Sequence, residues 1–157
     1  MTALQRRGIG AAAGSAALLA AAYAFQHLGG LAPCPLCLWQ RWPHWIAVGL
    51  GLPLLVLPWR ALAAAGALAM LASAGIAGYH AGIEAGWWPG PATCAAPDVS
   101  GLTAEELLQA ILAAPVVRCE DVAWSFLGIS MAGWNGLASL GLAALWLRAY
   151  ASSSASQ

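Results

Sequence analysis

The sequence contains no lysine and very little charge of either sign. Only 8% of its 157 residues are charged, whereas a soluble domain carries about a quarter. Six arginines balance six acidic residues, so no basic surface is available for nucleic acid, and we expect no such partner. Because 61% of the residues are hydrophobic, the composition indicates a membrane protein, and the length allows a single domain.

The sequence also lacks the paired motifs typical of a zinc site. Its four cysteines form one C-x-x-C motif, Cys34 to Cys37, and two separate positions, Cys94 and Cys119. Zinc sites of the ribbon type need two such motifs, so we expect no bound metal, and a metal-binding protein stays as an alternative.

Four apolar stretches approach the length of about 20 residues that a membrane-spanning helix needs. We expect an all-α membrane protein, a four-transmembrane-helix bundle in which residues 1–150 form one domain and residues 151–157 a disordered cytoplasmic tail. The predicted spans cover residues 8–28, 38–57, 61–83 and 124–147. The predicted outer loops cover residues 29–37 and 84–123, and the turn between spans two and three is Pro58-Trp59-Arg60.

The arginines indicate which way these spans cross the membrane. Four of them fall on one side, Arg6, Arg7, Arg60 and Arg148, and two on the other, Arg41 and Arg118. Positive charge concentrates on the cytoplasmic side, so both termini are predicted to be cytoplasmic. All four cysteines then face the outer, oxidising side, where cysteines tend to pair.

The N-terminal stretch has a second interpretation. Arg6-Arg7 followed by apolar residues also resembles a cleavable signal peptide. We favour a retained span because no soluble domain follows for export. The cysteines would face outside in either case.

The second outer loop contains the pattern of an amphipathic helix. Residues 103–106 match a capping box. An apolar stripe at helical spacing follows, Leu107, Leu108, Ile111 and Leu112, and Pro115 ends the run. We expect a short helix on the membrane surface, with packing on a small core within the loop as the alternative.

The C-x-x-C motif stands where the second span enters the membrane. Pro35 suits a first helical turn, and the helix dipole would favour a thiolate at Cys37. Arg41, four residues later, would lie on the same face. Arg41 could also reach the membrane interface as an anchor, but the nearby Cys37 favours a functional role. Pro43 is expected to kink this helix.

Other polar residues near the outer side support weaker interpretations. His80 and Glu84 could relay protons, and we favour an interfacial hydrogen-bonded pair. Arg118 could lower the pKa of the Cys119 thiol or be a solvated loop charge. His27 ends the first span and is interpreted as an interface residue.

The electrons released by disulfide formation need an acceptor. Forming a disulfide releases two electrons and two protons, and we find no flavin or haem motif in the chain. The bilayer contains quinone, which takes up two electrons and two protons. This balance indicates a quinone acceptor, although the sequence contains no motif for one.

Several segments resemble the bacterial disulfide bond formation protein B (DsbB) family over nearly the whole chain. The matching segments are residues 25–27, 33–37 with Gln40-Arg41, 91–94, Cys119, and 124–128. The resemblance implies an enzyme of the bacterial inner membrane that oxidises a DsbA-like periplasmic protein and reduces ubiquinone or menaquinone. One departure is Gln40, where the best-known member has an acid. We expect a monomer.

The resemblance also implies residue roles. Cys34–Cys37 and Cys94–Cys119 would be two redox-active disulfides, and the second would oxidise the DsbA-like partner, which attacks Cys94. Cys119 would then pair with Cys34, freeing Cys37 as a thiolate against quinone, with Arg41 stabilising the charge. The nearest rival enzyme is a vitamin K epoxide reductase-like protein, whose redox pair is expected near a later span.

Overall fold

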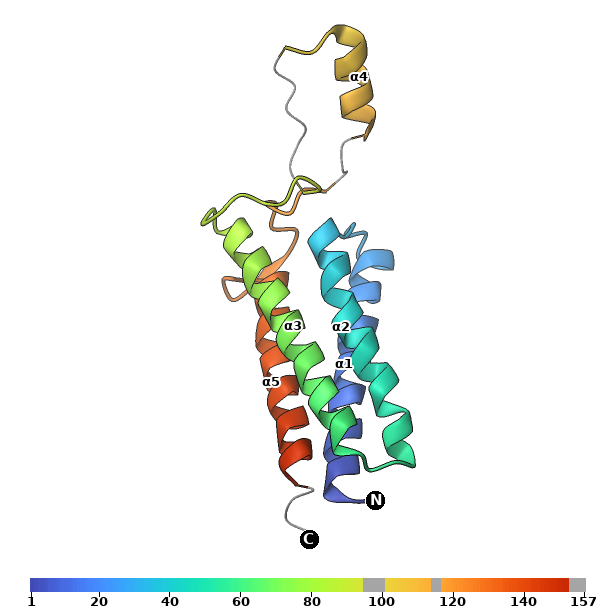
Figure 1. Cartoon of the computed structure of the whole chain (residues 1–157). Helices are drawn as coiled ribbons and strands as arrows, with labels where there is room; N and C mark the ends of the chain where they lie inside the picture. Colours follow the sequence, from blue (N-terminus) through green and yellow to red (C-terminus); the bar gives the residue numbers. More distant parts are fainter. Residues whose placement is uncertain (95–100, 114–116, 153–157) are drawn as a thin grey trace.

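The structure is a bundle of four long helices with a separate short helix (Figure 1). It is a computed structural model that describes residues 1–94, 101–113 and 117–152. The long helices are α1 (Ala3–His27), α2 (Pro35–Gly51), α3 (Arg60–Glu84) and α5 (Met131–Ala151). They pack in the cyclic order α1, α2, α3, α5, and α1 has little contact with α3. The N-terminus and the end of α5 lie at the same end of the bundle (Figure 1), as an even number of spans requires.

The first helix begins earlier than its apolar stretch. Thr2 caps α1 because its side chain accepts a hydrogen bond from the Gln5 backbone N–H, and the Gln5 side chain accepts one from the Thr2 backbone N–H. This capping box starts the helix at Ala3, five residues before the predicted start of the span. A criterion based on hydrophobicity alone does not detect a helix cap formed by polar side chains.

The second helix is shorter than predicted and is shifted toward the N-terminus. It runs from Pro35 to Gly51 and contains Pro43 in its interior. Pro53 has no N–H to continue the helix, and a 3-10 turn, η1 (Pro53–Leu55), follows. The predicted end at residue 57 and the three-residue turn are therefore wrong, because residues 52–59 connect α2 to α3.

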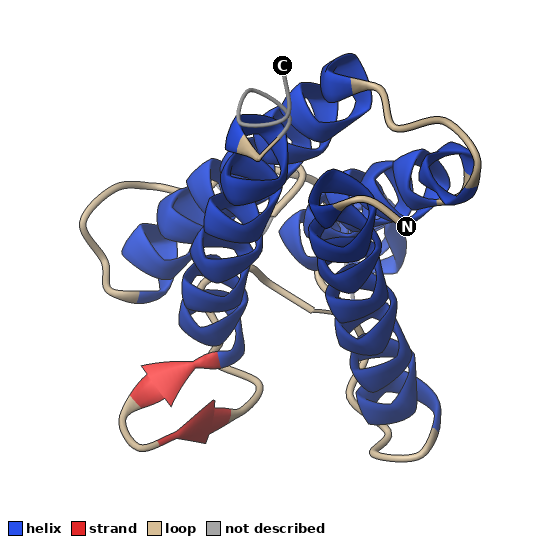
Figure 2. Ribbon diagram, turned by 90° about the horizontal axis from the view of Figure 1, so that it is seen from below, coloured by secondary structure: helices blue, strands red, loops and turns tan. Residues whose placement is uncertain are grey.

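The last long helix begins later than predicted. A hairpin precedes it, with β1 (Ser125–Phe126) antiparallel to β2 (Ile129–Ser130) (Figure 2). Leu127 and Gly128 both have positive φ, 52° and 76°, as a two-residue hairpin turn requires. Ser130 then caps α5 by accepting from the Gly133 backbone. The predicted start of the span at residue 124 is therefore wrong by seven residues.

The short helix α4 (Ala104–Ala113) lies apart from the bundle (Figure 1). The predicted capping box is confirmed, since the Thr103 backbone N–H donates to Glu106 Oε2 at 2.8 Å and the Glu106 N–H to Thr103 Oγ1 at 3.4 Å. The apolar stripe is exposed, so no core covers it among the described residues. Pro115, the predicted end of the run, lies outside the described residues, as does the tail from residue 153.

Two helices of the described chain, α1 and α3, are long and apolar enough to cross a membrane. The 17 residues of α2 extend about 25 Å at the usual rise, less than the hydrocarbon core of about 30 Å. The helical class is thus established, together with the packing of four long helices. The four-span membrane topology is a proposal, to which we return below.

The core of the bundle depends on close helix approach around Trp146. Its side chain is fully buried, and a side chain added at Gly66 of α3 would collide with the indole ring. We expect Gly66→Ala to lower the free energy of unfolding by about 2 kcal/mol, the usual cost of overpacking. Gly75 of the same helix has nothing within 4 Å of an added Cβ. Gly75→Ala is the matched control and should be neutral or stabilising when both variants are unfolded in micelles.

Candidate thiol–disulfide site

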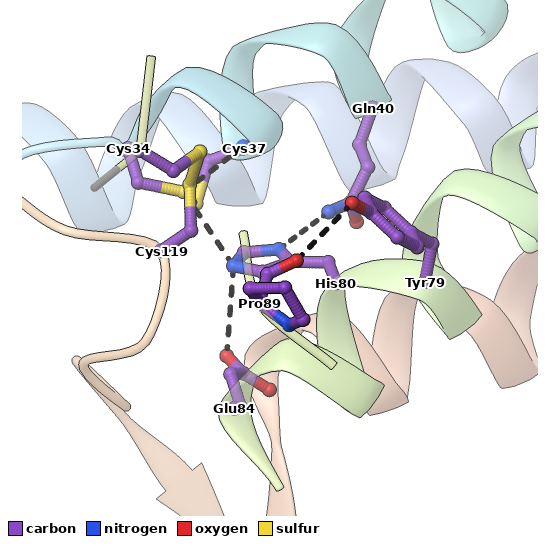
Figure 3. Close-up of a disulfide and its surroundings, with 9 residues drawn as sticks. Cys34, Cys37, Gln40, Tyr79, His80, Glu84, Pro89 and Cys119 are labelled. Atoms are coloured by element: carbon purple, nitrogen blue, oxygen red, sulfur yellow. Dashed lines mark hydrogen bonds and ion pairs between the residues drawn. A yellow bond between two sulfur atoms is a disulfide. The ribbon is translucent and has the colours of Figure 1, made fainter. Parts of the chain in front are cut away.

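All four cysteines gather at one end of the bundle. Cys94 and Cys119 form a disulfide that closes the second loop. Cys34 and Cys37 are free thiols whose sulfurs lie 2.8 Å apart. Cys34, Cys94 and Cys119 are buried in one cluster with Cys37 packed against it, and Figure 3 shows the Cys119 side chain directed at the thiol pair. The Cys94–Cys119 disulfide that the family resemblance implied is therefore present in the structure, whereas Cys34 and Cys37 are a thiol pair and not the second disulfide that it implied.

The start of α2 positions the thiol pair. Cys34 caps the helix, because its sulfur accepts a hydrogen bond from the Cys37 backbone N–H at 3.2 Å. Pro35 occupies the first helical position, and Cys37 lies in the first turn, as predicted. The hydrogen bond between the Cys34 and Cys37 sulfurs, together with burial, raises the pKa of the Cys34 thiol. The two sulfurs therefore differ in environment, and the surroundings of Cys34 disfavour its thiolate form.

His80 of α3 lies directly beside the thiol pair (Figure 3). Its Nε2 is 3.5 Å from Cys34 Sγ, and Glu84 Oε1 is 3.9 Å from the same nitrogen. On the other side of the ring, the Gln40 amide donates to Nδ1 at 2.8 Å. The sequence favoured an interfacial hydrogen-bonded pair of His80 and Glu84. The structure places the two side chains 3.9 Å apart and also brings His80 to the thiol pair.

A buried polar network continues from Gln40 into the bundle. Asn135 of α5 donates to Gln40 Oε1 at 2.7 Å, and its own Oδ1 lies 3.0 Å from His44 Nε2. Two hydroxyls complete the network, because Ser73 Oγ lies 3.2 Å from His44 Nε2 and accepts from Ser139 at 3.0 Å. The network therefore joins α2, α3 and α5.

Arg41 occupies the other side of α2, facing α1. Its Nη1 donates to Gln26 Oε1 at 2.7 Å, and its guanidinium lies 4.7 Å from the centre of the Tyr23 ring. His27 stacks on the same Tyr23 ring, with 6.1 Å between ring centres. Arg41 is half-buried and is held in place by neutral partners, so its positive charge is available to a ligand.

A cavity of about 460 Å³ connects these groups. Its walls are mainly apolar, and its polar lining comes from the thiol pair, the buried network, Arg41 and the acidic residues Glu84 and Asp121. The hairpin and the adjacent chain add aromatic walls. The polar and aromatic lining residues include Cys34, Cys37, Gln40, Arg41, His44, His80, Asn135, Trp124, Phe126 and Trp134. The size and the lining suit a flat apolar molecule with a few hydrogen-bonding oxygens.

Cys34, Cys37 and His80 also form a possible metal-ligand set. One ligand atom from each lies within 4.8 Å of the others. Two thiolates and an imidazole are ligands that zinc accepts, although a structural zinc site has four.

Arg118 is paired within its own loop. Its guanidinium forms a two-pronged ion pair with Asp121, with distances of 3.0 and 3.2 Å, and both side chains are about half exposed. This pairing lowers the pKa of the Asp121 carboxyl. Of the two interpretations, the structure favours the loop charge over an effect on the Cys119 thiol.

A disulfide buried against a free thiol pair, at the end of a bundle of apolar helices, defines a membrane-type thiol–disulfide oxidoreductase. The chain matches the family model "Disulfide bond formation protein DsbB" over residues 6–149, and it belongs to that family.

Curated relatives agree with this assignment. Disulfide bond formation protein B of Methylococcus capsulatus is 35% identical over 148 residues, covering 84% of this chain and 85% of the relative. The proteins of the same name from Polaromonas naphthalenivorans and Stutzerimonas stutzeri are 34% and 31% identical. They cover 87% and 85% of this chain, and 86% of each relative is covered. No solved structure matches.

Sequence reasoning gave no role to several residues of the site, above all Asn135 and the two serines of the network. A signal was available, because a polar residue inside a membrane span is expensive and is kept for function or internal pairing. Asn135 is the only asparagine in the chain. Its place beside Gln40, from another helix, could not be read from spacing alone.

Proposed function

We propose that this protein is a thiol:quinone oxidoreductase that reoxidises a DsbA-like periplasmic protein and passes two electrons to a membrane quinone. One observation carries the proposal: the free thiol pair opens on an apolar cavity on one side and packs against a disulfide on the other. Such a pair can exchange electrons with a protein through the disulfide and with a lipid-soluble acceptor through the cavity. Family membership supports the same direction of flow.

The proposed setting is the bacterial inner membrane. All four long helices would span it as one domain, with both termini in the cytoplasm and the thiol–disulfide site at the periplasmic face. The arginine distribution and the location of both termini at one end support this topology. The exposed apolar face of α4 would rest on the periplasmic surface of the inner membrane, since Ile111 and Leu112 are 59% and 71% exposed.

The proposed exchange begins at the second loop. A thiolate of the partner attacks Cys94, and Cys119 is released as a thiolate. Cys119 then attacks Cys34 of the Cys34–Cys37 disulfide, so that Cys37 leaves with the electron pair. Cys94 and Cys119 have no exposed surface in the structure, so the loop must open for the partner to reach them.

The electrons then leave through the cavity. The Cys37 thiolate lies in the first turn of α2, and Arg41 lies one turn further along the same helix. The arginine would stabilise negative charge that develops on the acceptor. A bound quinone supplies the two-electron, two-proton acceptor, and these residues bind it and hold its reacting end near the sulfur.

The direct test uses purified protein, a reduced DsbA-like protein and ubiquinone. We expect catalytic oxidation of the thiol protein with one quinone reduced per disulfide formed. Replacing ubiquinone with menaquinone identifies the preferred acceptor. Turnover that is independent of any quinone would contradict the proposal.

The topology predicts which side of the membrane the thiols face. In spheroplasts treated with a reductant, a membrane-impermeant maleimide added outside should label the cysteines. A cysteine introduced at Ser153 in the cytoplasmic tail is the control, and it should be labelled only after lysis. Labelling of Cys34 or Cys94 from the cytoplasmic side alone would overturn the topology.

A metal-binding function is the second candidate because the thiol pair and His80 lie within reach of one ion. The Gln40 hydrogen bond to His80 Nδ1 opposes it, because it leaves the ring proton on the nitrogen that would have to bind the metal. Metal analysis of the reduced, purified protein separates the two functions. One tightly bound zinc per chain would favour the metal-binding function.

A further inference from the structure

We propose that Gln40 and Asn135 are positioning residues that hold His80 in the Nε2–H tautomer, with this N–H directed at the Cys34 sulfur. The tautomer follows from hydrogen bonds alone. Its use in disulfide exchange rests on the proposed function.

The first step is the direction of the amide hydrogen bonds. Asn135 Nδ2 donates to Gln40 Oε1 at 2.7 Å, so Gln40 presents its NH₂ group to His80 Nδ1 at 2.8 Å. An amide nitrogen can only donate, so Nδ1 must accept and carries no proton. A neutral imidazole then has its proton on Nε2.

The second step is where this proton points. Nε2 lies 3.5 Å from Cys34 Sγ, within hydrogen-bond distance for sulfur, and 3.9 Å from Glu84 Oε1, beyond that for oxygen. The His80 and Glu84 side chains are 4% and 9% exposed. The Cys34 sulfur is therefore the nearest side-chain acceptor for the proton on Nε2, and the Cys119 backbone also accepts a hydrogen bond from the His80 ring.

The third step explains why the network has this direction and not the reverse. Asn135 Oδ1 accepts from His44 Nε2 at 3.0 Å, which places the His44 proton on Nε2. His44 Nδ1 is buried and has no hydrogen-bond partner. If both amides were rotated, that atom would become an unpaired buried N–H, which is rarer in proteins than an unpaired acceptor. His44 thus fixes the orientation of Asn135, and Asn135 fixes that of Gln40.

The consequence concerns the release of Cys34. When a Cys94 thiolate attacks Cys119 of a Cys34–Cys119 disulfide, the Cys94–Cys119 bond forms and the Cys34–Cys119 bond breaks. Cys34 leaves with the electron pair as a thiolate, and no external oxidant or reductant is consumed. An N–H already directed at this sulfur stabilises the leaving charge, and such charge-assisted hydrogen bonds are the strong ones.

The test is the protonation pattern of His80 in the full-length protein in micelles. Long-range ¹H–¹⁵N spectra of ¹⁵N-histidine-labelled protein distinguish the tautomers, and the chain has only three histidines to assign. We expect the Nε2–H form for wild type. A wild-type His80 protonated on Nδ1 would overturn the proposal without need of any variant, and it would leave the proposed oxidase activity unaffected.

Three variants test the relay itself. Gln40→Met and Asn135→Leu should both reduce the Nε2–H population, whereas Ser15→Ala removes a buried hydroxyl whose hydrogen bond goes to Met70, outside the network, and should leave it unchanged. With Cys37→Ser added, alkylation of Cys34 by iodoacetamide at pH 7 should be about fivefold slower in the Gln40 and Asn135 variants. An Asn135→Leu protein with wild-type spectrum and alkylation rate would show that no relay exists.

Discussion

Cys37→Ser should abolish quinone-dependent oxidation of the thiol partner, with turnover at least a thousandfold below wild type. Cys37 lines the cavity beside Cys34 and lies in the first turn of α2, and the serine hydroxyl cannot replace its nucleophilic or redox chemistry. The rest of the site stays intact because the two side chains are nearly the same size. Measurement of quinone absorbance during turnover gives the rate directly.

The Cys37→Ser protein contains its own control. Its Cys94–Cys119 disulfide is unchanged, so it should still oxidise one equivalent of the partner in a single turnover. A burst of one equivalent followed by no further reaction would locate the defect between the thiol pair and the quinone. Full steady-state turnover would show that Cys37 is not the electron donor.

Arg41→Ala should raise the quinone KM about tenfold and leave the reaction with the partner protein unchanged. The guanidinium lines the cavity one helical turn from Cys37 and is held by neutral groups, so its charge can be given to the acceptor. A tenfold change corresponds to about 1.4 kcal/mol of binding free energy, which is reasonable for one charged hydrogen bond. Initial rates at varied ubiquinone concentration measure the effect.

The matched control for Arg41 is Arg60→Ala. Arg60 begins α3 at the opposite end of the bundle, where its guanidinium lies 4.3 Å from the centre of the Tyr150 ring. This variant removes the same charge and should leave the quinone KM unchanged. Equal effects of the two substitutions would mean that Arg41 acts only as a structural or interfacial arginine.

Much of the fold could be predicted because apolar length and capping patterns are local signals. The third helix was predicted to within one residue at each end, and the capping box of α4 was recognised from four letters. The errors occur where polar hydrogen bonds decide a boundary. Thr2 extends α1, and the hairpin before Ser130 shortens α5.

The grouping of the Cys34 and Cys37 sulfurs could be predicted from the sequence, whereas the side chains that surround them were less predictable. The Cys34–Cys37 motif defines its own geometry, because Pro35 and the helix start place both sulfurs together. The approach of His80, Gln40 and Asn135 depends on how three helices pack. No spacing within one helix contains that information.

The short length of α2 has a consequence for where electron transfer occurs. If α2 crosses the membrane as proposed, its length of about 25 Å is about 5 Å less than the bilayer core. Lipids would relieve this hydrophobic mismatch by thinning locally, or the helix end would be drawn inward. At its inner end, exposed Leu52, Leu55 and Val56 continue the apolar surface and anchor that side. In the proposed topology, the acyl chains would therefore meet the bundle near the level of Cys37, and a carrier diffusing in the lipid would reach the sulfur without leaving the hydrocarbon.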